Sequence, residues 1–237
     1  MVSTTGWIIG GTALITMIVS IIFGIFFIYK AKKLKAKLLY YAGFIIICSG
    51  LFYLGASTTF LSLIITGKNI PNDSGVHGLL TYTSVAPGII CAMYLGSELL
   101  VPEKKKIIVS MYAVIGIIFE IFLYINPNAS IKFTNEDSSE ELIDSSFVLL
   151  HPTFIIIVLL LISVFIFCGI GFLIKAQQAS GDIKKKYRYI SLSFIVFVIS
   201  AVFDALLSPG IWLIPVRIGM IIYALLLYIG LHPTKTI

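Results

Sequence analysis

The chain has 237 residues, of which 59% are hydrophobic and only 12% are charged. A soluble domain carries about twice that charged fraction, so the composition excludes a soluble globular protein. The formal net charge is +6, but the basic residues gather in short segments between apolar runs. They do not form one continuous basic surface, and this distribution excludes nucleic acid as a partner.

Seven apolar runs, each about as long as the ~20 residues that cross a bilayer or longer, follow one another along the chain. In hydrocarbon every backbone N–H and C=O must be paired within its own segment, so each run is predicted to be a helix. The fold class expected is an all-α membrane protein, with one domain over residues 1–237 embedded in the lipid bilayer. The predicted spans are 7–29, 38–66, 78–101, 106–125, 148–174, 189–207 and 211–231.

The first run is predicted to be a transmembrane span and not a signal peptide, because it lacks a basic leading segment and is too long. Small or polar residues recur along it at every fourth position, which favours close packing against another helix. These residues are Thr12, Thr16, Ser20 and Gly24. The second and fifth runs exceed the length needed to cross, so tilted helices or projecting ends are expected.

The third and fourth runs carry residues that are typical of inward-facing helix surfaces. Within the third run, small and polar residues form a stripe along one helix face: Thr81, Ser84, Gly88 and Cys91. Pro87 in the same run predicts a kink. In the fourth run, Glu120 shares a helix face with Gly116 and Tyr124, which lie four residues before and after it.

The longest segment between runs, residues 126–147, is acidic and is expected to form an external loop. It sets Lys132 against five carboxylates: Glu136, Asp137, Glu140, Glu141 and Asp144. One interpretation is a solvated loop whose polarity reflects exposure. The other is a lid whose field attracts cations or basic ligands.

The last three runs contribute the remaining ionisable groups. His151 lies near the start of the fifth run, Asp204 lies near the end of the sixth with Ser200 one turn before it, and Arg217 lies six residues into the seventh. At 1.5 Å per residue, Asp204, Arg217 and Glu120 all lie within roughly 9 Å of the same membrane boundary. Together with His151, four groups from four helices are therefore expected in the outer third of the membrane.

Asp204 and Arg217 are predicted to form an ion pair, because a very short turn joins their runs and sets both residues at the same height. One interpretation is a structural pair that fixes the register of this helical hairpin. The other is a ligand or proton site, with further candidates at Glu120, His151, Tyr124, Ser200 and Thr81. Arg217 has five N–H donors, so it is expected to serve Glu120 as well.

The basic residues also predict the orientation. They follow the first, third, fifth and seventh runs, at residues 30–37, 104–106, 175–188 and 235. The positive-inside rule therefore places the N-terminus outside and the C-terminus inside the plasma membrane. Spans 1–2 and 5–6 run in the same directions, and the ends of spans 1 and 5 have similar residues, which allows a 3+1+3 parallel pseudo-repeat.

No catalytic set can be assembled from the spans. The seventh run has no lysine for a retinal Schiff base, and a membrane aspartyl protease would need a second aspartate beside Asp204. A zinc cluster of His77, His151 and His232 is excluded, because His232 falls on the opposite side. We therefore expect neither an enzyme nor a metal or other cofactor.

Two stretches, TYTSVAPGIICAMYLGSELLVPEKKKIIVSMYAVIGIIFEIFLY and FVISAVFDALLSPGIWLIPVRIGMIIYALLLYIGL, resemble uncharacterised seven-helix membrane proteins of archaea. Such chains are similar to the seven-helix sensory region that precedes some histidine kinases, here without the kinase. The resemblance implies a fold and a membrane location, and it supplies no ligand.

Three functions remain open. The first is a receptor or sensor with an outward-facing pocket for a small polar ligand, which signals through a separate cytoplasmic or membrane partner. The second is a small-solute or proton-coupled transporter, in which the polar cluster is the substrate or proton site. The third is a structural or assembly subunit, in which the charges serve packing alone.

Overall fold

The computed structural model describes residues 2–207 and 210–232. Within them, six helices are long and apolar enough to cross a membrane, and there are seven if the bent pair α2–α3 counts as one span. Only helices and closed barrels satisfy the backbone inside a bilayer. Helices of this number, length and composition make the chain a multi-pass membrane protein, as the sequence predicts.

The helical elements are α1 Thr4–Leu34, α2 Lys37–Leu51, α3 Leu54–Thr66, α4 Val76–Tyr82, α5 Val85–Leu100, α6 Lys105–Ile125, α7 Pro127–Ser130, α8 Pro152–Val164, α9 Gly171–Gln178, α10 Gly181–Leu206 and α11 Leu213–Leu231. A 3₁₀ turn, Pro102–Lys104, precedes α6, and a π-helical segment, Phe165–Ile170, joins α8 to α9. The two strands are β1 Ile131–Thr134 and β2 Asp144–Phe147. The bounds of α1, α6, α10 and α11 agree with the predicted spans to within a few residues, except at the C-terminal end of α1 and the N-terminal end of α10, which extend further.

Two predicted spans are broken. The second run, read as one long helix, bends by 45° between α2 and α3. The third breaks between α4 and α5, at Thr83 and Ser84. Pro87 explains this second break, because it lacks the N–H that would bond to the carbonyl of Thr83 one turn earlier. The helix is therefore interrupted close to the predicted kink, four residues before the proline.

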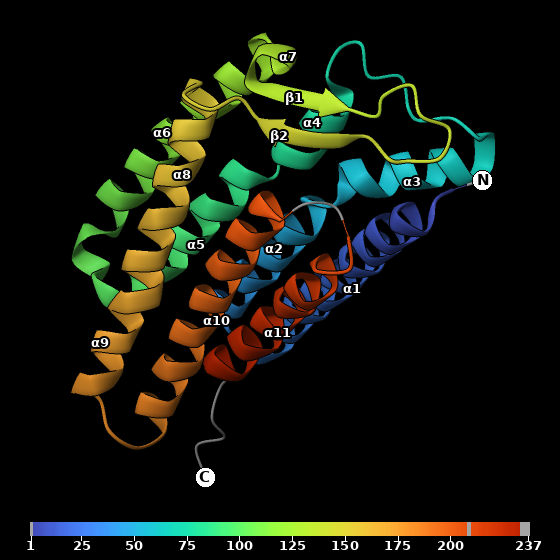
Figure 1. Ribbon diagram of the computed structural model, residues 1–237. Helices are drawn as coiled ribbons and strands as arrows, with labels where there is room; N and C mark the ends of the chain where they lie inside the picture. Colours follow the sequence, from blue (N-terminus) through green and yellow to red (C-terminus); the bar gives the residue numbers. More distant parts are fainter. Residues whose placement is uncertain (1, 208–209, 233–237) are drawn as a thin grey trace.

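The molecule has two chemically different ends (Figure 1). The N-terminus, the β1–β2 hairpin and the start of α11 lie together at what we call the hairpin end. The α1–α2, α5–α6 and α9–α10 turns lie at the opposite, lysine end, which carries the basic segments 30–37, 104–106 and 184–188.

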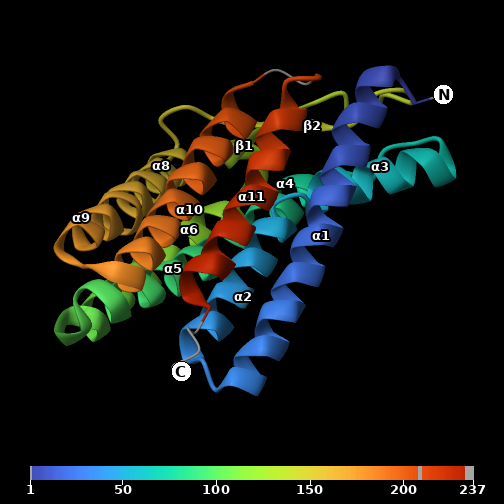
Figure 2. The ribbon, with the colours of Figure 1, turned by 90° about the horizontal axis from the view of Figure 1, so that it is seen from below.

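The core lies where α1, α2, α5, α10 and α11 pack together. Seen from below, α11 lies between α1 and α10 (Figure 2). Large side chains such as Phe27, Phe194 and Tyr223 are fully buried there. The small-residue ridge expected on the first span is confirmed between α1 and α2, where a Cβ at Gly24 would meet the carbonyl oxygen of Gly43 at 2.7 Å.

The acidic segment 126–147 folds instead of remaining an open loop. After α7, strands β1 and β2 pair antiparallel, with Ile131 opposite Phe147. Ile131, Leu142 and Ile143 are buried, and the N–H of Ser3 donates to the carbonyl of Glu140 at 2.8 Å. The all-α expectation therefore holds except for this hairpin, which covers part of the hairpin end (Figure 1).

Candidate ligand cavity at the hairpin end

A cavity of about 410 Å³ opens at the hairpin end. Its walls come from the α2–α3 and α4–α5 breaks, from α8, α10 and α11, and from β2 with the residue before it. The lining is mainly apolar and aromatic, with Phe52, Phe147, Phe154 and Phe197 among its side chains. Its size is typical of sites for small molecules, which occupy about 300–1,000 Å³.

The two helix breaks shape this cavity. Phe52 and Tyr53 form the bend between α2 and α3, and Tyr82 ends α4. All three line the cavity. A straight second span would place successive side chains at steps of 100° around one axis. The bend instead directs two adjacent aromatic rings toward the same space.

The predicted ion pair is present in the cavity wall. Arg217 Nε lies 3.8 Å from Asp204 Oδ1, and both residues line the cavity. This separation exceeds a hydrogen bond, and neither atom has a hydrogen-bond partner among the residues described. The pair therefore acts through its charges, and each of these two atoms keeps an unused hydrogen-bonding site.

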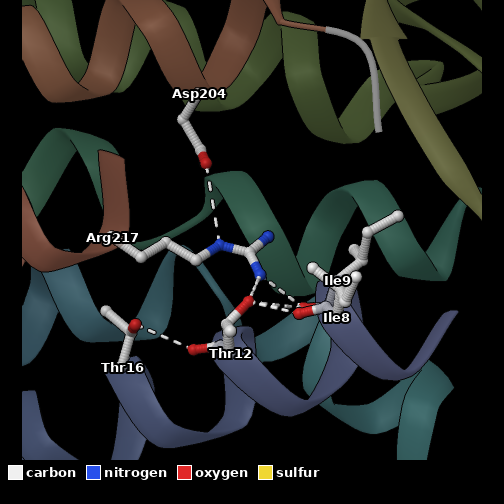
Figure 3. A network of polar contacts seen from close by, with 6 residues as sticks. All are labelled: Ile8, Ile9, Thr12, Thr16, Asp204 and Arg217. Atoms are coloured by element: carbon white, nitrogen blue, oxygen red, sulfur yellow. Dashed lines mark hydrogen bonds and ion pairs between the residues drawn. The ribbon is translucent and has the colours of Figure 1, made fainter. Parts of the chain in front are cut away.

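Arg217 has partners on α1 that sequence reasoning missed (Figure 3). Its terminal nitrogen Nη1 donates to the hydroxyl of Thr12 and to the carbonyl oxygen of Ile9. The ring of Tyr53 faces the guanidinium, with its centroid 5.2 Å from Cζ. Arg217 thus connects α11 to α1, to α10 and to the α2–α3 bend. Charge-assisted contacts of this kind are stronger than neutral ones.

Thr12 was interpreted only as part of a packing ridge, and that interpretation was incomplete. Its hydroxyl donates to the carbonyl of Ile8 at 2.5 Å, which leaves the oxygen free to accept from Arg217. The signal in the sequence is a hydroxyl in the first span at about the depth of Arg217. Thr16, one turn further along α1, donates only to the carbonyl of Thr12.

The two charges differ in accessibility. The Asp204 side chain keeps 29% of its surface exposed, whereas the Arg217 side chain keeps 6%. The hydroxyl of Tyr53 also interacts with the Asp204 carboxylate. The carboxylate is therefore the charge that a molecule in the cavity reaches first.

Further polar groups line the cavity on the side of α4 and the hairpin. Thr81, a predicted site residue, lines it and donates to the carbonyl of His77 at 2.9 Å. The imidazole of His77 pairs with the Thr59 hydroxyl at 3.0 Å. Asp144 lies in β2, where burial raises the pKa of its carboxyl and a hydrogen bond from the Ser145 N–H opposes that shift.

The structure does not bring Glu120 to this site. Its two carboxyl oxygens are buried without a hydrogen-bond partner in the described parts of the chain, and it does not line the cavity. Arg217 interacts with Asp204 and α1 and forms no ion pair with Glu120, so the expectation of a shared guanidinium is wrong. Tyr124, on the same face of α6, pairs with the Thr83 hydroxyl at 2.7 Å.

His151 and Ser200 have local packing roles in the structure. His151 precedes α8, where its Nδ1 pairs with the Thr153 hydroxyl at 2.8 Å and accepts from the Thr153 N–H at 3.4 Å. Ser200 is buried where α10 touches α11, and a Cβ at Gly219 would clash with its hydroxyl. Neither residue lines the cavity.

Within the described ranges, no group of three His, Cys, Asp or Glu residues could hold a metal ion. The three cysteines, Cys48, Cys91 and Cys168, are free thiols. No protein-family model matches the chain, and the search of curated proteins gives no significant match. The fold and the cavity thus define a multi-pass membrane protein with a charged, aromatic-lined cavity at one end of its helix bundle.

Proposed function

We propose that the chain is a receptor-like or sensor-like membrane protein that binds a small ligand in the hairpin-end cavity and signals through a separate partner. One observation carries the proposal: the cavity has the volume of a ligand site and contains the Asp204–Arg217 pair. Charges inside a membrane are costly and typically mark functional sites. The mainly apolar lining changes the expected ligand from a polar molecule to an amphipathic one.

The proposed orientation places the hairpin end outside the plasma membrane and the lysine end in the cytoplasm. The distribution of Lys and Arg supports it. Trp7 lies in the first turns of α1 and Trp212 directly precedes α11. Both are largely exposed, and tryptophans commonly mark a membrane interface. The ligand would then enter from outside.

A blocked cavity tests the proposal. Ala201 lines the cavity, so Ala201→Phe should fill it, whereas Ile64→Phe on the exposed face of α3 is the matched control. Purified protein in nanodiscs would be screened by saturation-transfer NMR with aromatic amines, acids and alcohols that share a phenylpropyl body. Binding that Ala201→Phe removes and Ile64→Phe preserves would support the proposal. A panel without a binder, or binding unaffected by Ala201→Phe, would contradict it.

A transporter is the second candidate, and the interruptions of the second and third spans favour it. Discontinuous helices at a binding site are typical of transporters, and residues beside the α2–α3 bend and the α4–α5 interruption line the cavity. The 3+1+3 pseudo-repeat stays a prediction. Uptake of the bound probe into proteoliposomes, measured with and without a proton gradient, separates the candidates. Uptake that Ala201→Phe abolishes would end the receptor proposal, and uptake that requires the proton gradient would establish proton coupling.

A purely structural role makes a different prediction for the charges. Replacing both members of a buried pair by apolar residues is often nearly neutral for stability. Under a structural role, the double variant Asp204→Leu with Arg217→Met should therefore fold and retain every binding property. A folded double variant that has lost binding of the probe would show that the pair does more than join helices.

A further inference from the structure

We infer that the ligand of the hairpin-end cavity is an organic cation, a protonated amine attached to an apolar body, and that Asp204 is its counter-ion. This inference rests on the proposed function, because it assumes that the cavity binds a ligand. It adds the sign of the ligand's charge, which the ion pair alone leaves open. Three independent features of the hairpin end decide that sign.

The first feature is which of the two charges a ligand can reach. The guanidinium of Arg217 is covered by Tyr53, and its Nη1 already donates to Thr12 and Ile9. Asp204 Oδ1 and Arg217 Nε are both buried without a hydrogen-bond partner within the described residues, but the Asp204 side chain as a whole is the more exposed, at 29% against 6%. A donor on the ligand therefore reaches the carboxylate more readily than an acceptor reaches the guanidinium.

The second feature is the charge of the lining. Two carboxylates, Asp144 and Asp204, and one guanidinium, Arg217, are its charged groups in the described part of the chain. Arg217 offsets one carboxylate, so the lining keeps a net negative charge. A protonated amine balances that charge, whereas a second carboxylate would add to it. In a site walled by hydrocarbon this difference is weakly screened.

The third feature is the charge of the hairpin that covers this end of the molecule. The hairpin that contributes Asp144 to the lining also carries an exposed acidic group at Glu136, Asp137, Glu140 and Glu141. Charges of one sign around an entrance raise the local concentration of the opposite ion. The same hairpin lines the cavity through residues 143–147, so its exposed carboxylates make the potential on this side of the molecule more favourable to cations than to anions.

The aromatic walls suit the same ligand. Tyr82 and Phe147 are in contact, with ring centroids 4.4 Å apart, and Phe154 lies next to Phe147 at 6.3 Å. Such rings bury an apolar body and also attract a cation at their faces. The inferred ligand thus has a head group for the carboxylates and a body for the rings.

The test uses three probes that differ only in their head group: 3-phenylpropylamine, 3-phenylpropionate and 3-phenylpropan-1-ol. Full-length protein in nanodiscs of zwitterionic phosphatidylcholine would be titrated with each at neutral pH by calorimetry. A charged contact is expected to make the amine bind at least about tenfold more tightly than the alcohol. The acid should bind more weakly than both.

Charge-removing variants locate the contact. Asp204→Asn should weaken the amine about tenfold and leave the alcohol unchanged. Asp182→Asn, an exposed carboxylate in α10 at the lysine end, is the control and should change neither. Asp144→Asn is the second variant, for use if Asp204→Asn does not fold, and should weaken the amine severalfold. An amine preference that survives both Asp144→Asn and Asp204→Asn would overturn the inference.

The probes also separate this inference from the proposed function. Tighter binding of the acid, or equal binding of all three probes, would overturn the cationic class while leaving a ligand cavity in place. If none of the three binds, the proposed function fails together with the inference. Binding of the amine that Ala201→Phe leaves unchanged would place its site outside the cavity and overturn the inference as well.

Discussion

The contact between Arg217 and Thr12 was not predicted from the sequence, and it can be tested by mutation. Thr12→Val keeps the shape of the side chain and removes the oxygen that accepts from Nη1. Arg217→Met keeps an unbranched side chain and removes the guanidinium. If the contact joins α1 to α11, the two substitutions should be coupled in a double-mutant cycle.

The expected magnitudes follow from the other contacts of Arg217. A hydrogen bond to a charged group contributes about 1.5–3 kcal/mol, but in Thr12→Val the Ile9 carbonyl and Asp204 still serve the guanidinium. We therefore expect Thr12→Val to cost about 1.5–2 kcal/mol, at the lower end of that range. Arg217→Met breaks the ion pair, for which about 3–5 kcal/mol is typical of buried pairs. Because Asp204 is 29% exposed, the lower part of that range applies.

The assay is unfolding by SDS in mixed micelles, with the free energy of unfolding compared among wild type, both single variants and the double variant. We expect a coupling energy of about 1 kcal/mol, within the range seen for residues in contact. Thr16→Val is the matched control, because Thr16 lies on the same helix and donates only to the carbonyl of Thr12. A coupling near zero for Thr12, or one equal to that of Thr16, would refute the contact.

Three other predictions test the arrangement of the chain. Cysteines placed at Ser138 and at Gln178 in a chain without native Cys should label from opposite sides of intact cells, and labelling from one side would contradict the seven-span topology. Gly55→Ala should lower the free energy of unfolding by about 1–3 kcal/mol, because a Cβ there would clash with α4. Gly11→Ala, which faces open space, should be neutral in the same SDS assay. Asn69→Ala should speed proteolysis of the segment 135–141, because Asn69 Nδ2 donates to backbone carbonyls there; an unchanged cleavage rate would show that these bonds do not hold the segment.

Much of the helical arrangement could be predicted from hydropathy, since the bilayer requires long apolar helices whatever their partners. The Asp204–Arg217 pair could be predicted for a related reason. A short turn sets both residues at one height, and hydrocarbon penalises either charge alone. Both arguments use depth in the membrane, which a count of residues gives directly.

The wrong or missing predictions concern which side of the bundle a residue faces. That side depends on the rotation of each helix about its own axis. Glu120 was expected beside Arg217 because both lie at a similar depth, but depth does not say which side of the bundle a residue faces. The same limit hid Thr12, which contacts Arg217 across 205 positions of sequence. The bend in the second span had a local signal, because Ser49 and Gly50 form the kind of pair at which helices kink.

The hairpin shows another limit of composition. The segment 126–147 was interpreted as a loop because it is acidic, yet Ile131, Leu142 and Ile143 are buried beneath its charged residues. Five large apolar residues scattered among five carboxylates do not produce a periodic pattern long enough to identify short strands. The lid interpretation gains support from the place of β2 in the cavity wall.

The position of Arg217 determines how any single substitution at this site must be interpreted. The same side chain holds α1 and α11 together and balances the carboxylate that faces the cavity. Removing it would disturb packing and binding together, so a loss of binding in Arg217→Met identifies neither role. Asp204→Asn keeps the shape of the side chain and every contact of Arg217 with α1, and Ala201→Phe changes no charge at all. These two variants test ligand binding without removing the contacts between α1 and α11, because Asp204→Asn changes the charge of the cavity and Ala201→Phe changes its volume.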